Sequence, residues 1–265
     1  MQAHTVPTPV KALVAVTYVV MIAMNGLANA LPLNGRTTGA VSDAYGNLFA
    51  PTGLTFAIWG VIYLLLGAHV LYQLGLFRDA AGGAPGRVAL LERVGLLFSV
   101  SSLVNTAWIF AWHYDVMWLS AVLLVTLLVL LILITRTVLG TELSAREKVF
   151  VRLPFSVYFG WITVATIANT TVWLVSTGWD GFGVADSVWA VAIIAVGTLI
   201  GATVILRDRD IAYGLVLIWA FFGIWLKHTS ASGFNSAYPA VSVAALVGIA
   251  AFVAAAAWVL LRMSR

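Results

Sequence analysis

The chain has 265 residues, of which 62% are hydrophobic and 9% are charged, whereas an ordinary soluble domain has roughly 45–50% and about 25%. Its mean hydropathy is +1.02. A water-soluble domain of this length cannot bury so much apolar surface, because the buried fraction rises slowly with chain length. The lack of cysteine excludes a disulfide scaffold and thiol chemistry. The net charge of +4 indicates cationic cytoplasmic loops rather than a nucleic-acid surface.

Eight segments are long and apolar enough to cross a bilayer, which takes about 20 residues. They are residues 10–31, 53–74, 94–112, 117–139, 149–175, 187–206, 211–226 and 238–261. Helices satisfy every backbone polar group within the segment, as lipid demands. The sequence therefore predicts an all-α polytopic membrane protein with an eight-helix bundle.

The charges of the loops predict the orientation of the chain. With a cytoplasmic N-terminus, two cations, Arg36 and Lys227, face outward, and twelve face the cytoplasm. The twelve are Lys11, Arg78, Arg87, Arg93, Arg136, Arg146, Lys148, Arg152, Arg207, Arg209, Arg262 and Arg265. Because cytoplasmic loops carry such an excess, we expect both termini in the cytoplasm.

The segment 34–50, called the first loop below, is polar and long for a connection without a function. We expect it to fold as a lid over the outer mouth between the first, second and fifth helices.

Ionisable side chains inside a membrane are costly and usually functional. All ten Asp and Glu residues lie in loops or at the ends of spans, which argues against a proton relay, an ion-coupled carrier and a carboxylate-bridged metal centre. His69 is a candidate axial ligand for haem, but a hydrogen-bonded helix histidine is the favoured interpretation. No motif indicates a catalytic group or a bound metal.

Amides and aromatic side chains recur at helical spacing in four spans. They are Asn25 and Asn29 in the first span, Trp59 and Tyr63 in the second, Asn105 and Trp108 in the third, and Tyr158, Trp161 and Asn169 in the fifth. Residues three or four apart share a helix face. For any one of them, helix packing is the commoner role. The residues of the second, third and fifth spans reach the same depth in the outer leaflet. Together they predict a pocket for a large planar apolar ligand.

Three motifs carry a resemblance to a known family. They are P-x7-W-x3-Y at Pro51, Trp59 and Tyr63, N-x-x-W at Asn105 and Trp108, and an aromatic residue followed by W-x7-N at Tyr158, Trp161 and Asn169. In this order, residues 10–175 resemble the translocator-protein family, TspO/MBR, also called tryptophan-rich sensory proteins. The three further spans are similar to a longer branch of that family, of about this chain's length.

The resemblance implies a TspO-like five-helix membrane domain over residues 1–175, with three additional helices over residues 176–265 packed on it. It also implies a cavity beneath the first loop that binds porphyrin, haem or sterol, with no required cofactor. The expected partners are a small lipophilic ligand and membrane lipid, without nucleic acid, and a homodimer stays open.

The leading functional hypothesis is a sensor or carrier for a tetrapyrrole or a similar planar lipophile. The alternatives are an intramembrane enzyme that oxidises porphyrin, a small-molecule transporter, and a scaffold in which these residues only pack helices.

Overall fold

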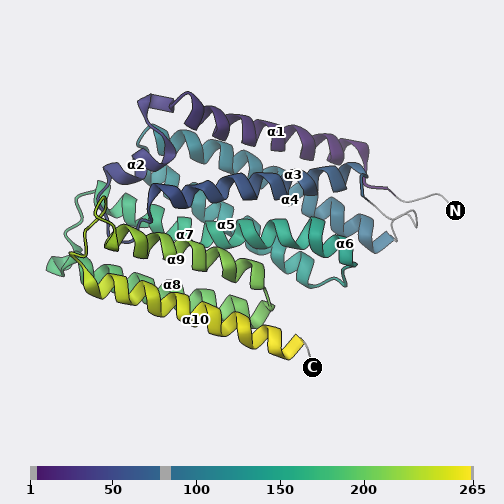
Figure 1. Ribbon diagram of the computed structural model, residues 1–265. Helices are drawn as coiled ribbons and strands as arrows, with labels where there is room; N and C mark the ends of the chain where they lie inside the picture. The colour runs from purple at the N-terminus through teal and green to yellow at the C-terminus, as the bar shows by residue number, and fades with distance from the viewer. Residues whose placement is uncertain (1–4, 78–84, 264–265) are drawn as a thin grey trace. The chain divides into compact units, whose positions relative to one another are not determined.

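The computed structural model describes residues 5–77 and 85–263 (Figure 1). Over these residues, eight helices are long and apolar enough to cross a membrane. Their main helices are α1 (Thr8–Ala30), α3 (Ile58–Leu74), α4 (Pro85–His113), α5 (Met117–Leu139), α7 (Leu153–Ser176), α8 (Asp186–Asp208), α9 (Ile211–Thr229) and α10 (Pro239–Met263). Helical turns before α3 and α7 extend the second span to Gly53–Leu74 and the fifth to Ala145–Ser176. The predicted all-α membrane fold with eight spans is therefore confirmed. Arg78 and Arg265, two of the twelve cations that predict the orientation, lie outside the described residues.

Six short elements connect or precede these helices. They are η1 (Leu33–Gly35), α2 (Thr38–Ala44), η2 (Gly53–Ala57), α6 (Ala145–Glu147), the π-helical turn η3 (Lys148–Arg152) and η4 (Gly181–Gly183). A capping box starts α6: the Ser144 hydroxyl accepts from the Glu147 backbone N–H at 3.2 Å, and Glu147 accepts from the Ser144 N–H at 2.7 Å. Such caps satisfy the N–H groups that the first turn of a helix leaves unpaired. The third span begins earlier than expected, at Pro85, because proline suits a first helical position.

The chain forms two compact units. Unit 1 comprises Met1–Arg36 and Trp59–Phe159, and unit 2 comprises Thr37–Ile58 and Gly160–Arg265. Helix α7 thus contributes its first turns to unit 1 and the remainder to unit 2. The division that the resemblance implies, a five-helix domain over residues 1–175 followed by three additional helices over residues 176–265, stays a prediction.

In unit 1, α4 packs against both α1 and α5. The buried face of α1 consists of residues three or four apart, Val10, Val14, Thr17, Met21, Asn25 and Ala28. On the opposite face, Val16 is 60% exposed. In a membrane helix the exposed apolar side chains face lipid, so both faces of the helix are apolar. The buried face therefore differs from the exposed one in its packing and not in its hydrophobicity.

In unit 2, α10 packs against both α8 and α9, and α9 also contacts η2. Glycines allow this close approach. A Cβ at Gly160 of α7 would lie 3.0 Å from the carbonyl oxygen of Tyr213 in α9, and a Cβ at Gly248 of α10 would lie 2.6 Å from the Phe221 ring. Small residues let helices approach closely in a membrane, where lipid gives no hydrophobic drive for association.

The contact at Gly160 predicts a measurable loss on substitution. We expect Gly160→Ala to destabilise the protein by about 1–3 kcal/mol, because the new methyl group meets helix backbone that cannot rotate away. Gly60→Ala is the matched control, since a Cβ there meets nothing within 4 Å, and alanine favours helix by about 1 kcal/mol. Unfolding of both variants in detergent micelles measures the difference. Equal stability of the two would contradict the close packing of α7 on α9.

Candidate ligand-binding site

A chain of hydrogen bonds joins three helices of unit 1. Asn25 of α1 donates from Nδ2 to Oδ1 of Asn105 in α4 at 2.8 Å, and Asn105 donates from Nδ2 to the hydroxyl of Tyr158 in α7 at 3.0 Å. The three side chains are at most 4% exposed. Most buried polar side-chain atoms in native proteins have a hydrogen-bond partner. These two hydrogen bonds therefore fix the positions of three predicted site residues, Asn25, Asn105 and Tyr158.

Aromatic rings lie beside this chain. The Trp59 ring of α3 stacks on Tyr63 at 5.5 Å and on Trp108 of α4 at 6.0 Å, with interplanar angles of 23° and 28°. Its edge meets the Tyr158 ring at 6.0 Å, and Trp108 stacks in turn on Trp112. Trp59, Tyr63, Asn105, Trp108 and Tyr158, singled out from the sequence, thus form one cluster, called the unit 1 cluster below.

One polar atom of the unit 1 cluster is distinctive. Trp108 is 4% exposed, and its Nε1–H has no hydrogen-bond partner among the described residues. A buried donor without a partner costs about 1–3 kcal/mol. In native structures such a group calls for an explanation, and an acceptor on a ligand is one.

The cluster is accessible at one side. Trp59 and Tyr63 are half-buried, whereas Asn105 and Tyr158 are fully buried. Asn29 is exposed, and its Nδ2 donates to the carbonyl oxygen of Asn25 in its own helix at 3.0 Å. The half-buried rings of Trp59 and Tyr63 are therefore the accessible part of the unit 1 cluster, and its amides are the buried part.

Two predicted site residues belong to unit 2. Trp161 is 3% exposed and meets the ring of Phe56 edge-on at 5.8 Å, and Asn169 is likewise 3% exposed. The expectation that Trp161 and Asn169 line one cavity together with Trp59, Tyr63, Asn105 and Trp108 stays a prediction.

His69 has the role that the sequence favoured. Its Nδ1–H donates to the carbonyl oxygen of Phe150 at 2.8 Å, and Nε2 lies 3.4 Å from Nε2 of Gln73. The ring packs between Phe98 and Phe155 at 5.6 and 4.8 Å. With a partner at each ring nitrogen, His69 is a hydrogen-bonded helix histidine.

The start of the first loop is tied to α4 within unit 1. Asn34 donates from Nδ2 to the carbonyl oxygen of His113 at 3.0 Å, and the His113 ring bonds to the carbonyl oxygen of Leu33 at 3.1 Å. Arg36 forms an ion pair with Asp115.

The remainder of the loop is tied to α9 within unit 2. Lys227 pairs with Asp43 at 2.9 Å, and Nε2–H of His228 donates to the carbonyl oxygen of Leu48 at 2.8 Å. Nearer the middle of α9, Trp219 donates from Nε1 to the carbonyl oxygen of Thr55 at 3.0 Å. The seventh span thus holds the first loop and the start of the second span.

In the sequence, Lys227 counts only as an outward-facing cation, and His228 carries no prediction. The available signal was a neighbouring pair of polar residues in the last turn of an apolar span. Nothing in their spacing named their partners, which lie about 180 residues earlier in the chain.

Comparison with known proteins adds family membership to this geometry. A family model described as TSPO-like protein matches residues 11–258, so the match continues beyond residue 175 through α8 and α9 and into α10. Neither the curated proteins nor the solved structures give a match. Because the matched segment covers nearly the whole chain and holds eight apolar helices, this chain is an integral multi-pass membrane protein that belongs to the TSPO-like family.

Proposed function

We propose that this protein binds a tetrapyrrole, such as a porphyrin or haem, or a similar planar lipophile, and acts as its sensor or carrier. The observation that carries the proposal is the buried Nε1–H of Trp108, which has no partner among the described residues and lies beside the Trp59 ring. The TSPO-like family supports a ligand-binding role in general.

The aromatic geometry suits a flat ligand. Trp59 lies nearly parallel to both Tyr63 and Trp108, and offset-stacked rings are a preferred aromatic arrangement. A planar macrocycle packs against the half-buried rings of Trp59 and Tyr63 and buries a large apolar area there. Membrane lipid covers what the protein leaves exposed.

The polar geometry suits a ligand with a peripheral acceptor. The amides of Asn25 and Asn105 are already engaged with each other and with Tyr158, so they position the site rather than bind the ligand directly. The Trp108 indole supplies a donor for a carboxylate or carbonyl oxygen at the ligand's edge. Trp161 and Asn169 enter the proposal through the motif that they share with the family.

Removing the Trp108 donor is expected to separate binding from packing. Trp108→Phe should weaken protoporphyrin binding about tenfold, the factor for one lost hydrogen bond to a charged group. Its stability should change little, because the lost packing is offset by removal of a costly buried N–H. Porphyrin quenching of tryptophan fluorescence and thermal unfolding in detergent measure the two effects. Trp118→Phe is the control, since Trp118 is 57% exposed on α5.

Full porphyrin affinity in Trp108→Phe, combined with a large loss of stability, would identify the cluster as packing alone. Conversion of the porphyrin to a product by the purified protein would favour the oxidative enzyme over a sensor or carrier.

The amide chain is expected to matter for stability first. Asn105→Ala removes the partner of Asn25 and of Tyr158, and it should cost about 1–3 kcal/mol for the groups left unsatisfied. Asn29→Ala, at an exposed amide one turn away in α1, should cost much less. Chemical denaturation of both variants in micelles measures their free energies of unfolding. Equal losses of stability would mean that the hydrogen bonds of Asn105 do not hold the three helices together.

We also propose that both termini are cytoplasmic, on the strength of the loop charges. Green fluorescent protein fused after Arg265 should fluoresce, and a truncation fused after Thr229, which has seven spans, should not. Alkaline phosphatase at the same two positions should give the opposite activities. Phosphatase activity after Arg265 would reverse the assigned orientation.

A further inference from the structure

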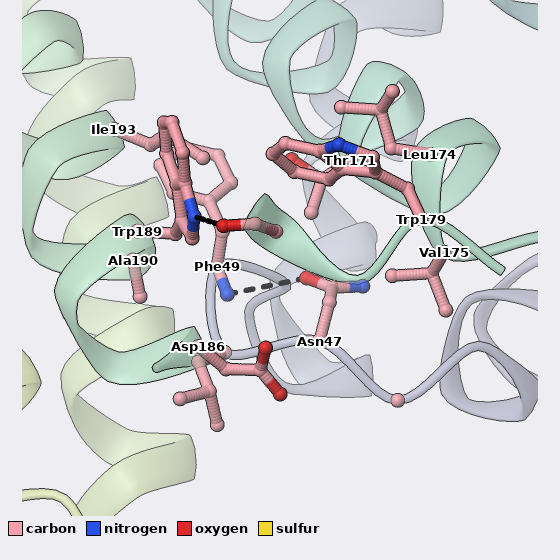
Figure 2. Close-up of a pocket in the computed structure, with 13 residues that line it drawn as sticks. Asn47, Phe49, Thr171, Leu174, Val175, Trp179, Asp186, Trp189, Ala190 and Ile193 are labelled. Carbon is pink, nitrogen blue, oxygen red and sulfur yellow. Dashed lines mark hydrogen bonds between the residues drawn. The ribbon is translucent and has the colours of Figure 1, made fainter. Parts of the chain in front are cut away.

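Unit 2 contains a cavity that the unit 1 cluster does not share. The first loop lines it with Asn47 and Phe49, and α7 lines it with Thr171. Trp179, in the turn between α7 and η4, and Asp186 and Trp189 of α8 complete the lining (Figure 2). Its volume is about 80 Å³, well below the roughly 300–1,000 Å³ of pockets for drug-sized ligands. It therefore suits a compact chemical group, not a tetrapyrrole.

Two indoles form its aromatic wall. The Trp179 and Trp189 rings lie 5.2 Å apart at 57°. Trp189 is fixed because its Nε1–H donates to the carbonyl oxygen of Gly181 at 2.9 Å. Gly181 has a φ of +64°, and a Cβ there would lie 3.0 Å from the Trp189 indole nitrogen. The turn thus requires glycine to bring its backbone against the ring.

The charged group of the lining is a carboxylate. Asp186 is exposed, and it has no ion pair or hydrogen bond with any other residue that the structure describes. The amide of Asn47 is occupied within the loop: Oδ1 accepts from the N–H groups of Phe49 and Ala50 at 3.1 and 2.8 Å, and Nδ2 donates to the carbonyl oxygen of Tyr45. The lining therefore offers a ligand one negative charge and two indole rings.

We propose that this pocket binds an alkylammonium group. Tryptophan faces attract organic cations through the ring quadrupole, and they are the usual walls of sites for quaternary ammonium ligands. Asp186 supplies the countercharge, and the first loop closes the pocket with Asn47 and Phe49. The same ammonium chemistry occurs in small soluble cations and in the headgroups of zwitterionic lipids, which lie at the ends of membrane helices.

The test uses the full chain in a maltoside detergent, which carries no ammonium group. Choline chloride is expected to quench tryptophan fluorescence and raise the unfolding temperature. Its uncharged carbon analogue, 3,3-dimethylbutan-1-ol, and sodium chloride at equal ionic strength are expected to do neither. No response to choline, or an equal response to the uncharged analogue, would overturn the proposal.

Matched variants assign the response to this pocket. Asp186→Asn should weaken choline binding about fivefold, the factor for one exposed ion pair. Asp180→Asn removes a charge from the preceding turn, outside the lining residues, and should bind choline normally. Gly181→Ala should disturb binding by displacing Trp189, whereas Gly183→Ala, also at positive φ but with open space around its Cβ, should not. Unchanged binding in Asp186→Asn would refute the role of the carboxylate.

Two lipid compositions identify the source of the ammonium group. In phosphatidylglycerol vesicles choline should act as in detergent. If phosphatidylcholine vesicles suppress the choline response, then the occupant is a lipid headgroup, and if they do not, then it is a soluble cation. Because none of these residues belongs to the unit 1 cluster, failure here leaves the tetrapyrrole proposal standing, and the reverse also holds.

Discussion

Hydrocarbon offers no hydrogen bonds, so a polar group within the membrane is costly unless it finds a partner in the protein. The backbone meets this constraint by forming helices. Many hydroxyl side chains meet it locally, as Thr166 does by donating to the carbonyl oxygen of Ile162 at 2.7 Å. Amides are too long to be satisfied so simply, and Asn25, Asn105 and Tyr158 instead satisfy one another across three helices. These hydrogen bonds remove the cost of burying the polar groups. They also fix α1, α4 and α7 relative to one another, and α4 carries Trp108.

Against this background, an unpaired buried donor is informative. Trp108 lies in a region where neighbouring amides and hydroxyls are engaged, yet its indole N–H has no partner among the described residues. The rings beside it lie nearly parallel. The proposed ligand, which is flat and carries an acceptor at its edge, is complementary to a stack of rings with one unpaired donor.

Helix α9 organises much of unit 2. It supplies a donor to the carbonyl oxygen of Thr55, a cation to Asp43 and an imidazole to the carbonyl oxygen of Leu48. Glycine makes the approach possible, since a Cβ at Gly223 would collide with Thr55. The seventh span therefore fixes the first loop, which lines the small aromatic cavity together with the end of α7 and the start of α8.

The sequence alone determined the membrane class, the eight spans and the sharing of helix faces. These properties follow from hydropathy and from the helical repeat, both of which act over a few turns of chain. Residues one turn apart, such as Trp59 and Tyr63, were therefore grouped correctly.

Contacts between distant segments were decided only in the tertiary structure. Nothing local could show that Trp108 lacks a partner, that His228 bonds to the carbonyl oxygen of Leu48, or that Asp186 lies in the lining of a cavity with Trp179 and Trp189. Each depends on which helices pack together and how closely. In a membrane that choice rests on shape and on pairwise hydrogen bonds, because the apolar surface of every span is equally suited to lipid.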